Sequence, residues 1–318
     1  MTSRNQWWPV ALISEVQANT PIGVSVAGEE IVVFRDNTGT VRALENRCPH
    51  RRVPLSLGKV RPEGWLQCGY HGWSFDGATG QCKAIPNLRQ SEQVPGAYGV
   101  YAYRAVEQNG LIYVSTDAEV LEVPAIRAGN GEVLASGRQM IGLGMEELLA
   151  ALLDGPDLLA QSAGVRLSDI LVADPERREG ALVMERAAFW PSQMPFYGFV
   201  HQYRLLFRLA ILPGDRECEL SLVAEGGEVL ATAHWAMAPS ARGVTAIFWQ
   251  LRLPGAGGMG RLWLQLCQRL GKAPLAPRSR VDFQALSTLL AGPSHYWTRQ
   301  AESPSLYGDL LLTQRAKR

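Results

Sequence analysis

Long apolar runs are missing from this chain of 318 residues. No segment approaches the roughly 20 consecutive apolar residues that a membrane-spanning helix requires. The segment Met1–Val10 also lacks the uninterrupted apolar stretch that is typical of a signal peptide. We therefore expect a cytoplasmic protein that does not act at a membrane.

A strong charge of one sign is missing as well. The 31 basic and 30 acidic residues leave a formal net charge of +1, which argues against nucleic acid as a partner. The five cysteines are dispersed along the chain, and this is not the pattern of a disulfide framework. Neither internal repeats nor low-complexity tracts are found, so a repeat architecture is not expected.

Histidines are few, five in all, but two of them form a distinctive pattern with two cysteines. Cys48-Pro-His50 is followed after seventeen residues by Cys68-Gly-Tyr-His71. Two thiolates and two neutral imidazoles can hold a [2Fe–2S] cluster of the Rieske type. The same four side chains could also bind a tetrahedral zinc ion.

The residues around these pairs resemble the Rieske ring-hydroxylating oxygenase family. The shared motifs are Cys48-Pro-His50-Arg-Arg52, Pro54-Leu-Ser-Leu-Gly58, Cys68-x-Tyr70-His71-Gly-Trp-Ser-Phe75 and Gly80-x-Cys82-x-x-Ile85-Pro86. The resemblance implies that Cys48, His50, Cys68 and His71 bind a [2Fe–2S] cluster, which leaves zinc as the weaker alternative. Tyr70 replaces an extra cysteine of the respiratory Rieske proteins, so we expect the oxygenase branch and a potential of roughly −150 mV.

Two domains are expected from the length. Residues 1–118 contain short β-type runs separated by turn signals such as Asn109-Gly110, and they predict an all-β Rieske domain. Residues 119–318 are expected to form the helix-grip domain that the resemblance implies, an antiparallel sheet with helices. The predicted fold class is α+β.

The second domain should begin with a helix, continue with a series of strands and end with helices. Helical composition at residues 146–153 is followed by β-rich runs between 181 and 253. Two late helical segments are expected, at residues 259–270 and 278–290.

The resemblance also implies a mononuclear iron site, and its histidines are missing here. The family holds this iron with two histidines and one carboxylate, the histidines following an aspartate as Asp-x-x-His-x-x-x-x-His. Asp154 matches the family's bridging aspartate, but Asp157 stands at the first histidine position and Ser162, or Gln161, at the second. Asp282 matches the carboxylate position, although the first turn of a helix explains an acid there equally well.

We therefore expect no mononuclear Fe²⁺ in this chain, with Asp157 and Asp282 as weak candidate ligands. The remaining histidines, His201, His234 and His295, lie in β-type runs or a late loop. Histidines in such places more often pack in the core than bind metal.

Three hypotheses of function stay open. The first is an electron-transfer subunit whose cluster serves the iron of an intact Rieske oxygenase subunit, in a hetero-oligomeric trimeric or hexameric ring. That complex would hydroxylate or oxidatively dealkylate a small organic substrate. The second is a self-sufficient Rieske monooxygenase with an atypical iron site, and the third is a non-catalytic, redox-sensing protein that binds a ligand.

A ferredoxin or flavin reductase should supply the electrons, and the charge near the cluster suits an acidic partner. Three acids, Glu45, Glu63 and Asp76, lie between residues 41 and 89. The basic residues there are Arg42, Arg47, Arg51, Arg52, Lys59, Arg61, Lys83 and Arg89. Some of them could instead pair with carboxylates inside the domain.

The ligand spacing leads to a first test. We expect the reduced protein, purified without oxygen, to give the low average g-value EPR spectrum of a [2Fe–2S] centre with mixed His and Cys ligands. Metal analysis should find about two irons per chain. Zinc without iron would contradict the cluster.

Overall fold

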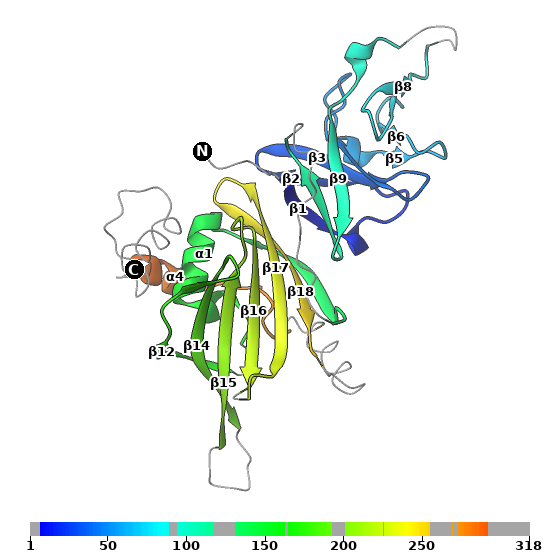
Figure 1. Ribbon diagram of the computed structural model, residues 1–318. Coiled ribbons are helices and arrows are strands. Elements are labelled where there is room, and N and C mark those ends of the chain that lie inside the picture. Colours follow the sequence, from blue (N-terminus) through cyan, green and yellow to red (C-terminus); the bar gives the residue numbers. More distant parts are fainter. Residues whose placement is uncertain are drawn as a thin grey trace. The chain divides into compact units, whose positions relative to one another are not determined.

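A computed structural model describes residues 7–88, 94–117, 131–162, 165–192, 201–224, 226–254, 269 and 273–291. The chain divides into two compact units (Figure 1), Met1–Ala128 with Ala238–Arg242, and Gly129–Met237 with Gly243–Arg318. The domain boundary expected between residues 118 and 119 lies outside the described residues. Among the helices described, none has the length and apolarity to cross a membrane.

The first unit is built from strands, as predicted. Its larger sheet has the strand order β1-β10-β9-β4-β3-β2 and its smaller sheet the order β5-β6-β7-β8. The larger sheet contains β1 (Trp7–Leu12), β2 (Ile22–Val26), β3 (Glu29–Arg35), β4 (Val41–Glu45), β9 (Ala102–Gln108) and β10 (Leu111–Ser115). The smaller sheet contains β5 (Lys59–Val60), β6 (Leu66–Gln67), β7 (Ser74–Phe75) and β8 (Cys82–Ala84). Short 3-10 helices lie at Ile13–Glu15, Leu55–Leu57 and Gly96–Tyr98.

β3 is buried on both faces, which explains its unbroken apolar run Ile31–Phe34. Alternate residues of this run pack into two different core clusters, because successive side chains of a strand point to opposite faces. The cluster around Phe34 also contains Cys48 and Cys68. The core of the domain therefore extends directly to the candidate cluster ligands.

The Asn-Gly turn predicted at residues 109–110 is confirmed. Asn109 has a φ of 51° and Gly110 a φ of 79°. They connect β9 to β10, whose residues Gln108 and Leu111 pair across the turn. Positive φ at both central residues is the type I′ geometry that asparagine and glycine favour in tight hairpins.

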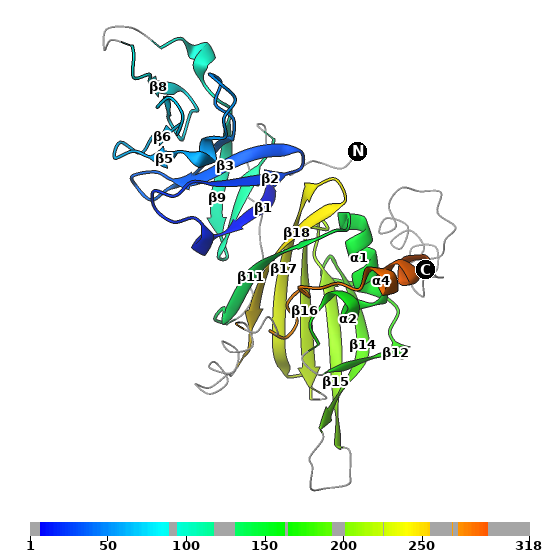
Figure 2. The same cartoon turned by 180° about the vertical axis from the view of Figure 1, so that it is seen from behind.

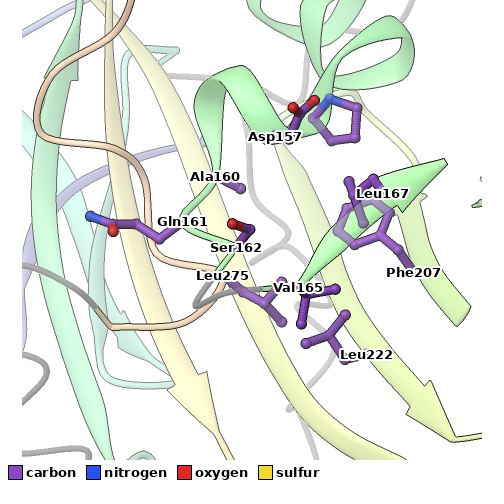
Figure 3. Close-up of a pocket in the computed structure, with 10 residues that line it drawn as sticks. Asp157, Ala160, Gln161, Ser162, Val165, Leu167, Phe207, Leu222 and Leu275 are labelled. Carbon is purple, nitrogen blue, oxygen red and sulfur yellow. The ribbon is translucent and has the colours of Figure 1, made fainter. Parts of the chain in front are cut away.

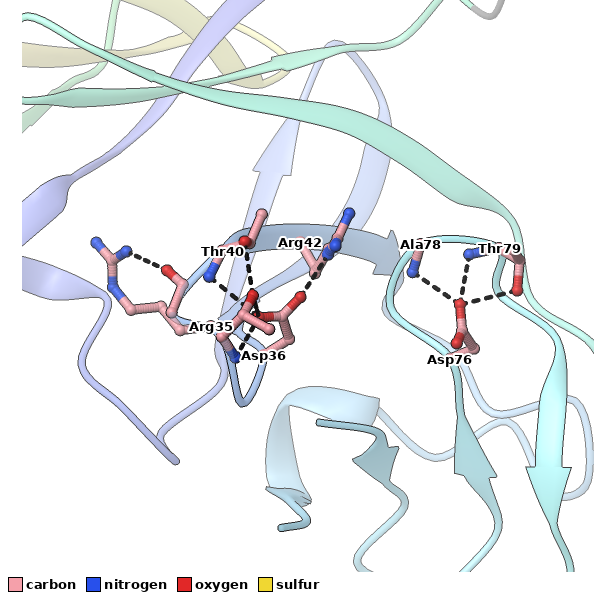
Figure 4. A network of polar contacts seen from close by, with 9 residues as sticks. Arg35, Asp36, Thr40, Arg42, Asp76, Ala78 and Thr79 are labelled. Carbon is pink, nitrogen blue, oxygen red and sulfur yellow. Dashed lines mark hydrogen bonds and ion pairs between the residues drawn. The ribbon is translucent and has the colours of Figure 1, made fainter. Parts of the chain in front are cut away.

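Two aspartates fix further turns of the first unit (Figure 4). Asp36 accepts hydrogen bonds from the backbone N–H of Thr38 at 2.9 Å and from Arg42 Nε at 2.8 Å. Asp76 accepts one from the backbone N–H of Thr79 at 2.9 Å. Burial alone would raise the pKa of both carboxyls, but the hydrogen bonds outweigh it and lower each pKa below its usual value.

The second unit is an antiparallel sheet with α1, α2 and α4 on one face (Figure 2), which confirms the α+β class. Its described strands follow the order β11-β18-β17-β16-β15-β14-β12, and β13 pairs with β14. The strands are β11 (Ala135–Ile141), β12 (Arg166–Val172), β13 (Glu176–Arg178), β14 (Ala181–Ser192), β15 (His201–Ile211), β16 (Glu217–Ala224), β17 (Val229–Ala241) and β18 (Val244–Arg252).

The helix predicted at residues 146–153 is confirmed as α1 (Met145–Asp154). Its residues from Leu148 onward are buried, and residues 148–153 belong to the same core cluster as Trp235 of β17. The chain then breaks at Gly155 and starts α2 (Pro156–Leu159), a single helical turn. Proline suits the first position of a helix because its missing N–H would have no partner there.

The late helix predicted at residues 278–290 is found as α4 (Phe283–Ala291), which begins five residues later than predicted. The shift has a local cause, since Asp282 accepts hydrogen bonds from the next turn and caps the helix at this point. The helix predicted at residues 259–270 lies outside the described residues, apart from residue 269.

Two glycines of the first unit offer a matched test of packing. Gly80 has a φ of +72°, and a Cβ there would lie 1.9 Å from the carbonyl oxygen of Val100. Gly39 has a φ of +82°, but nothing lies within 4 Å of its Cβ position. We expect Gly39→Ala to lower the free energy of unfolding by roughly 1–2 kcal/mol, because alanine is strained in the left-handed backbone conformation. Gly80→Ala should lower the free energy of unfolding, measured with denaturant, by clearly more, because its Cβ also clashes with Val100. Equal losses in the two variants would contradict this steric explanation.

Candidate metal centre

The first candidate ligand loop follows β4 and is closed on itself by backbone hydrogen bonds. The N–H of Cys48 donates to the carbonyl oxygen of Val53 at 2.9 Å. The carbonyl oxygen of Cys48 accepts from the N–H of Arg52 at 2.8 Å. Arg52 has a positive φ of 61°, which turns the chain back toward the core.

The second loop, between β6 and β7, repeats this pattern at the same spacing. The N–H of Cys68 donates to the carbonyl oxygen of Trp73 at 2.8 Å, and its carbonyl oxygen accepts from Gly72 at 3.1 Å. Gly72 has a φ of 74°, at the position that Arg52 holds in the first loop. The two loops thus close around their cysteines in the same way, although His50 follows Cys48 by two residues and His71 follows Cys68 by three.

Together the loops arrange the four candidate ligands as two pairs. Cys48 and Cys68 are only 2% and 4% exposed, whereas His50 and His71 are exposed with ring centroids 4.7 Å apart. Burial, reinforced by neighbouring Cys68, raises the pKa of Cys48 to about 11. Loss of hydration and the nearby charges of His71 and Arg51 lower the pKa of His50, so its neutral form, which binds metals, is favoured.

This donor set fits a [2Fe–2S] cluster better than a zinc ion. Zinc requires ligands gathered around one point. Within the described residues, no three His, Cys, Asp or Glu side chains lie close enough together to hold a single ion. A Rieske cluster instead takes two thiolates on one iron and two imidazoles on the other, which matches the separation into buried thiols and exposed imidazoles.

A pocket of the second unit contains the positions at which the family's histidines were expected (Figure 3). It has about 260 Å³ of space, its open mouth included. Asp157 and Ser162 lie among apolar lining residues that include Phe207 and Leu222. The side chain of Gln161 points away from the other labelled residues (Figure 3), so Ser162 is the better match to the second position.

The backbone around this pocket differs from a continuous helix. Asp157 lies in α2, which ends at Leu159, and the chain then runs extended alongside residues 275–277. The N–H of Gln161 donates to Ala276 O, and Leu275 N–H donates to Gln161 O, both at 2.8 Å. Asp157 and Ser162 therefore reach the pocket from a helical turn and from an extended segment.

Asp154 is the last residue of α1 and is buried. Arg186 of β14, only 2% exposed, donates from Nη2 to the carbonyl oxygens of Leu153 and Asp154 at 3.0 and 2.9 Å. A cation at the C-terminal end of a helix satisfies carbonyl groups that have no partner within the helix. Arg186 was not among the residues expected from the sequence. A charged residue inside a β-rich run was nevertheless a signal that it could bind a buried polar group such as a helix end.

Asp282 is exposed and does not line the pocket. Its Oδ1 accepts hydrogen bonds from the backbone N–H groups of Gln284 at 3.1 Å and Ala285 at 3.0 Å. This is the geometry of an N-cap. The placement favours the helix-cap interpretation over the iron-ligand interpretation.

The other histidines stay apart from the pocket as far as they are described. His234 of β17 is buried, and its Nε2 lies 3.1 Å from a carboxylate oxygen of Glu217 in β16. The side chain of His201 and the whole of His295 lie outside the described residues.

Comparison with known proteins bears on the first unit. Residues 6–102 match the family model of the Rieske [2Fe-2S] domain. The first unit is a Rieske [2Fe–2S] domain. This agrees with the two closed loops, the buried thiols and the paired imidazoles.

Relatives of the Rieske domain include oxygenase subunits. The chain is 35% identical over 130 residues to the 3-chlorobenzoate-3,4-dioxygenase oxygenase subunit of Comamonas testosteroni, covering 40% of this chain and 30% of that protein. It is 39% identical over 109 residues to the chloroplast protein TIC 55 of Arabidopsis thaliana, covering 34% of this chain and 20% of that protein. The matches thus span less than a third of the length of these relatives.

The fold of the whole chain has a solved counterpart. Apo dicamba monooxygenase superposes with a TM-score of 0.66 at 18% identity, covering 99% of this chain and 96% of that chain. The chain therefore has the fold of dicamba monooxygenase, an N-terminal β Rieske domain followed by an antiparallel-sheet domain with few helices.

Asp282 gives a test that separates a cap from a metal ligand. We expect Asp282→Ala to lose about 1 kcal/mol of unfolding free energy, because the N-cap hydrogen bonds are lost. Asp282→Asn should retain most of the stability, because asparagine is also a good N-cap. Iron content should be unchanged in both variants, and loss of iron without loss of stability would favour the ligand role.

Proposed function

We propose that this chain is the electron-transferring subunit of a Rieske oxygenase and that its cluster serves the iron of an intact partner subunit. The observation that carries the proposal is a complete cluster ligand set in the first unit, combined with a pocket of the second unit that has Asp157 and Ser162 where two imidazoles are expected. A carboxylate and a hydroxyl in a largely apolar pocket do not supply the two-histidine site of non-haem iron oxygenases.

The cluster, held by Cys48, His50, Cys68 and His71, supplies one electron at a time. The protein's part is to bury the two thiols in the Phe34 core while leaving both imidazoles exposed. Because electron transfer weakens steeply with distance, exposed imidazoles favour a partner that docks directly on these loops. The proposal therefore places the partner against His50 and His71.

The surface around the imidazoles supports a docking role. Arg42 and Arg61 are bound to Asp36 and Glu63 at 2.8 and 3.1 Å, so they contribute little to attraction. Five exposed basic side chains between residues 41 and 88 form no ion pair among the described residues, namely Arg47, Arg51, Arg52, Lys59 and Lys83. Positive charge beside exposed Leu57 and Tyr70 suits a partner with an acidic rim and an apolar centre.

The electron source is proposed by analogy with a related system. Rieske oxygenases form oligomers and accept electrons from a ferredoxin, and the oxygenase of carbazole 1,9a-dioxygenase has been solved in complex with its ferredoxin. We propose the same order here, from a ferredoxin or flavin reductase to this chain and then to an intact oxygenase subunit. The substrate, a small organic molecule, would react at the partner's iron.

The pocket favours one alternative function. Its apolar lining with Asp157 at one end could bind a small molecule without any chemistry, as in a redox-sensing protein. A self-sufficient monooxygenase is the remaining alternative. Iron content separates it from the others, because it needs about three irons per chain instead of about two.

The decisive experiment uses a complex of the full chain with an intact oxygenase subunit that carries the Asp-x-x-His-x-x-x-x-His pattern. We expect co-expression to give a closed hetero-oligomer that turns over substrate when reductase and oxygen are supplied. His71→Ala should reduce turnover to near background, because the cluster loses a ligand. Asp157→Ala should leave turnover unchanged.

The chain by itself supplies the control. With Fe²⁺, reductase and oxygen, the isolated protein should reoxidise slowly and form no product. If Asp157→Ala abolishes turnover in the complex while His71→Ala does not, the donor role is wrong. Stoichiometric product from the isolated chain would favour the self-sufficient alternative.

A further inference from the structure

A continuous run of aromatic rings crosses the cluster site. Tyr98 packs on Trp73 with ring centroids 5.3 Å apart, and Trp73 stacks on His50 at 4.9 Å with an interplanar angle of 1°. His50 meets His71 edge-on at 4.7 Å, and His71 lies against Tyr70 at 3.8 Å. Of these four contacts, only the one between Trp73 and His50 has parallel rings.

The side-chain contacts of His50 are ring contacts, with Trp73 and with His71. A histidine that binds a metal is usually oriented by a hydrogen bond from its second ring nitrogen to a carboxylate or carbonyl. Within the described part of the chain, neither His50 nor His71 makes a side-chain hydrogen bond. The flat indole of Trp73 covers one face of His50 and so restricts the rotation of its ring.

Trp73 is well placed to hold this position. Its backbone belongs to the second ligand loop, where its carbonyl oxygen accepts from Cys68 N–H at 2.8 Å, while its ring lies on His50 of the first loop. The indole also packs on the core cluster around Phe34. Trp73 therefore connects both ligand loops to each other and to the core.

Tyr98 supports the indole from the far end of the run. It is the last residue of the 3-10 helix Gly96–Tyr98, and its N–H donates to the carbonyl oxygen of Pro95 at 3.0 Å. The tyrosine is 41% exposed, so its ring covers part of the indole of Trp73 while remaining at the surface itself.

We infer that Trp73 is a positioning residue for the cluster ligand His50, and that Tyr98 in turn positions Trp73. The inference requires the cluster and does not depend on the proposed partner. Two Fe³⁺, two sulfides and two thiolates give a neutral oxidised cluster, and reduction adds one negative charge. Water near His50 stabilises that charge, so covering one face of this exposed imidazole with Trp73 keeps the reduction potential lower than it would be with both faces in water.

The test compares variants of the full chain by redox titration and by EPR of the reduced protein. Trp73→Leu removes the flat ring but keeps an apolar side chain, and we expect a higher potential and broader EPR lines from a less ordered imidazole. Trp73→Phe retains a stacking ring and should remain close to the parent protein in both measurements. Tyr98→Leu should shift the potential in the same direction by a smaller amount, and Tyr98→Phe should not shift it.

Tyr101 is the matched control, because it is 46% exposed in the same domain and packs on Tyr103 outside this run. Tyr101→Leu should leave potential and line width unchanged. If Trp73→Leu fails to fold or to bind iron, the reduction potential of the Tyr98→Leu variant, which changes an exposed residue, tests the inference instead. An unchanged potential in Tyr98→Leu, or an equal shift in Trp73→Phe and Trp73→Leu, would overturn the inference.

Discussion

Placing two thiols in the core and two imidazoles at the surface is the constraint on which the first domain depends. Each cysteine uses both its N–H and its carbonyl oxygen to close its own loop, with Val53 and Arg52 in one case and Trp73 and Gly72 in the other. The backbone is thereby satisfied locally, which buried backbone groups require. The sulfur atoms can then face the Phe34 core without leaving polar groups unpaired beside them.

The second domain satisfies a different constraint, because the carbonyl groups at the end of a buried helix need hydrogen-bond partners. α1 is buried from Leu148 to its last residue, so its final carbonyl groups cannot turn to water. Arg186 meets two of them from β14, and a cation there also opposes the helix dipole. The cost of burying a guanidinium is offset by these bonds. Asp154 is held in place by the same contacts.

Features coded by local pattern could be predicted from the sequence. The Asn109-Gly110 turn, the helix α1 and the two Cys-His pairs each depend on residues close together in the chain. The single turn of α2 could not be predicted, because it ends where the chain pairs with residues 275–277, far along the sequence. The contact between Tyr98 and Trp73 likewise joins positions whose proximity only the folded domain creates.

The shortness of α2 bears on whether two histidines could form an iron-binding pair at positions 157 and 162. Histidine substituted at position 157 would project from a helical turn, but histidine at position 162 would project from a segment that lies outside any helix. Rebuilding a continuous helix requires breaking the bonds of Gln161 with Ala276 and Leu275, and that of Arg278 with Leu159. Two point substitutions would therefore not create a helical pair of histidines at these positions, because the backbone would also have to be rearranged.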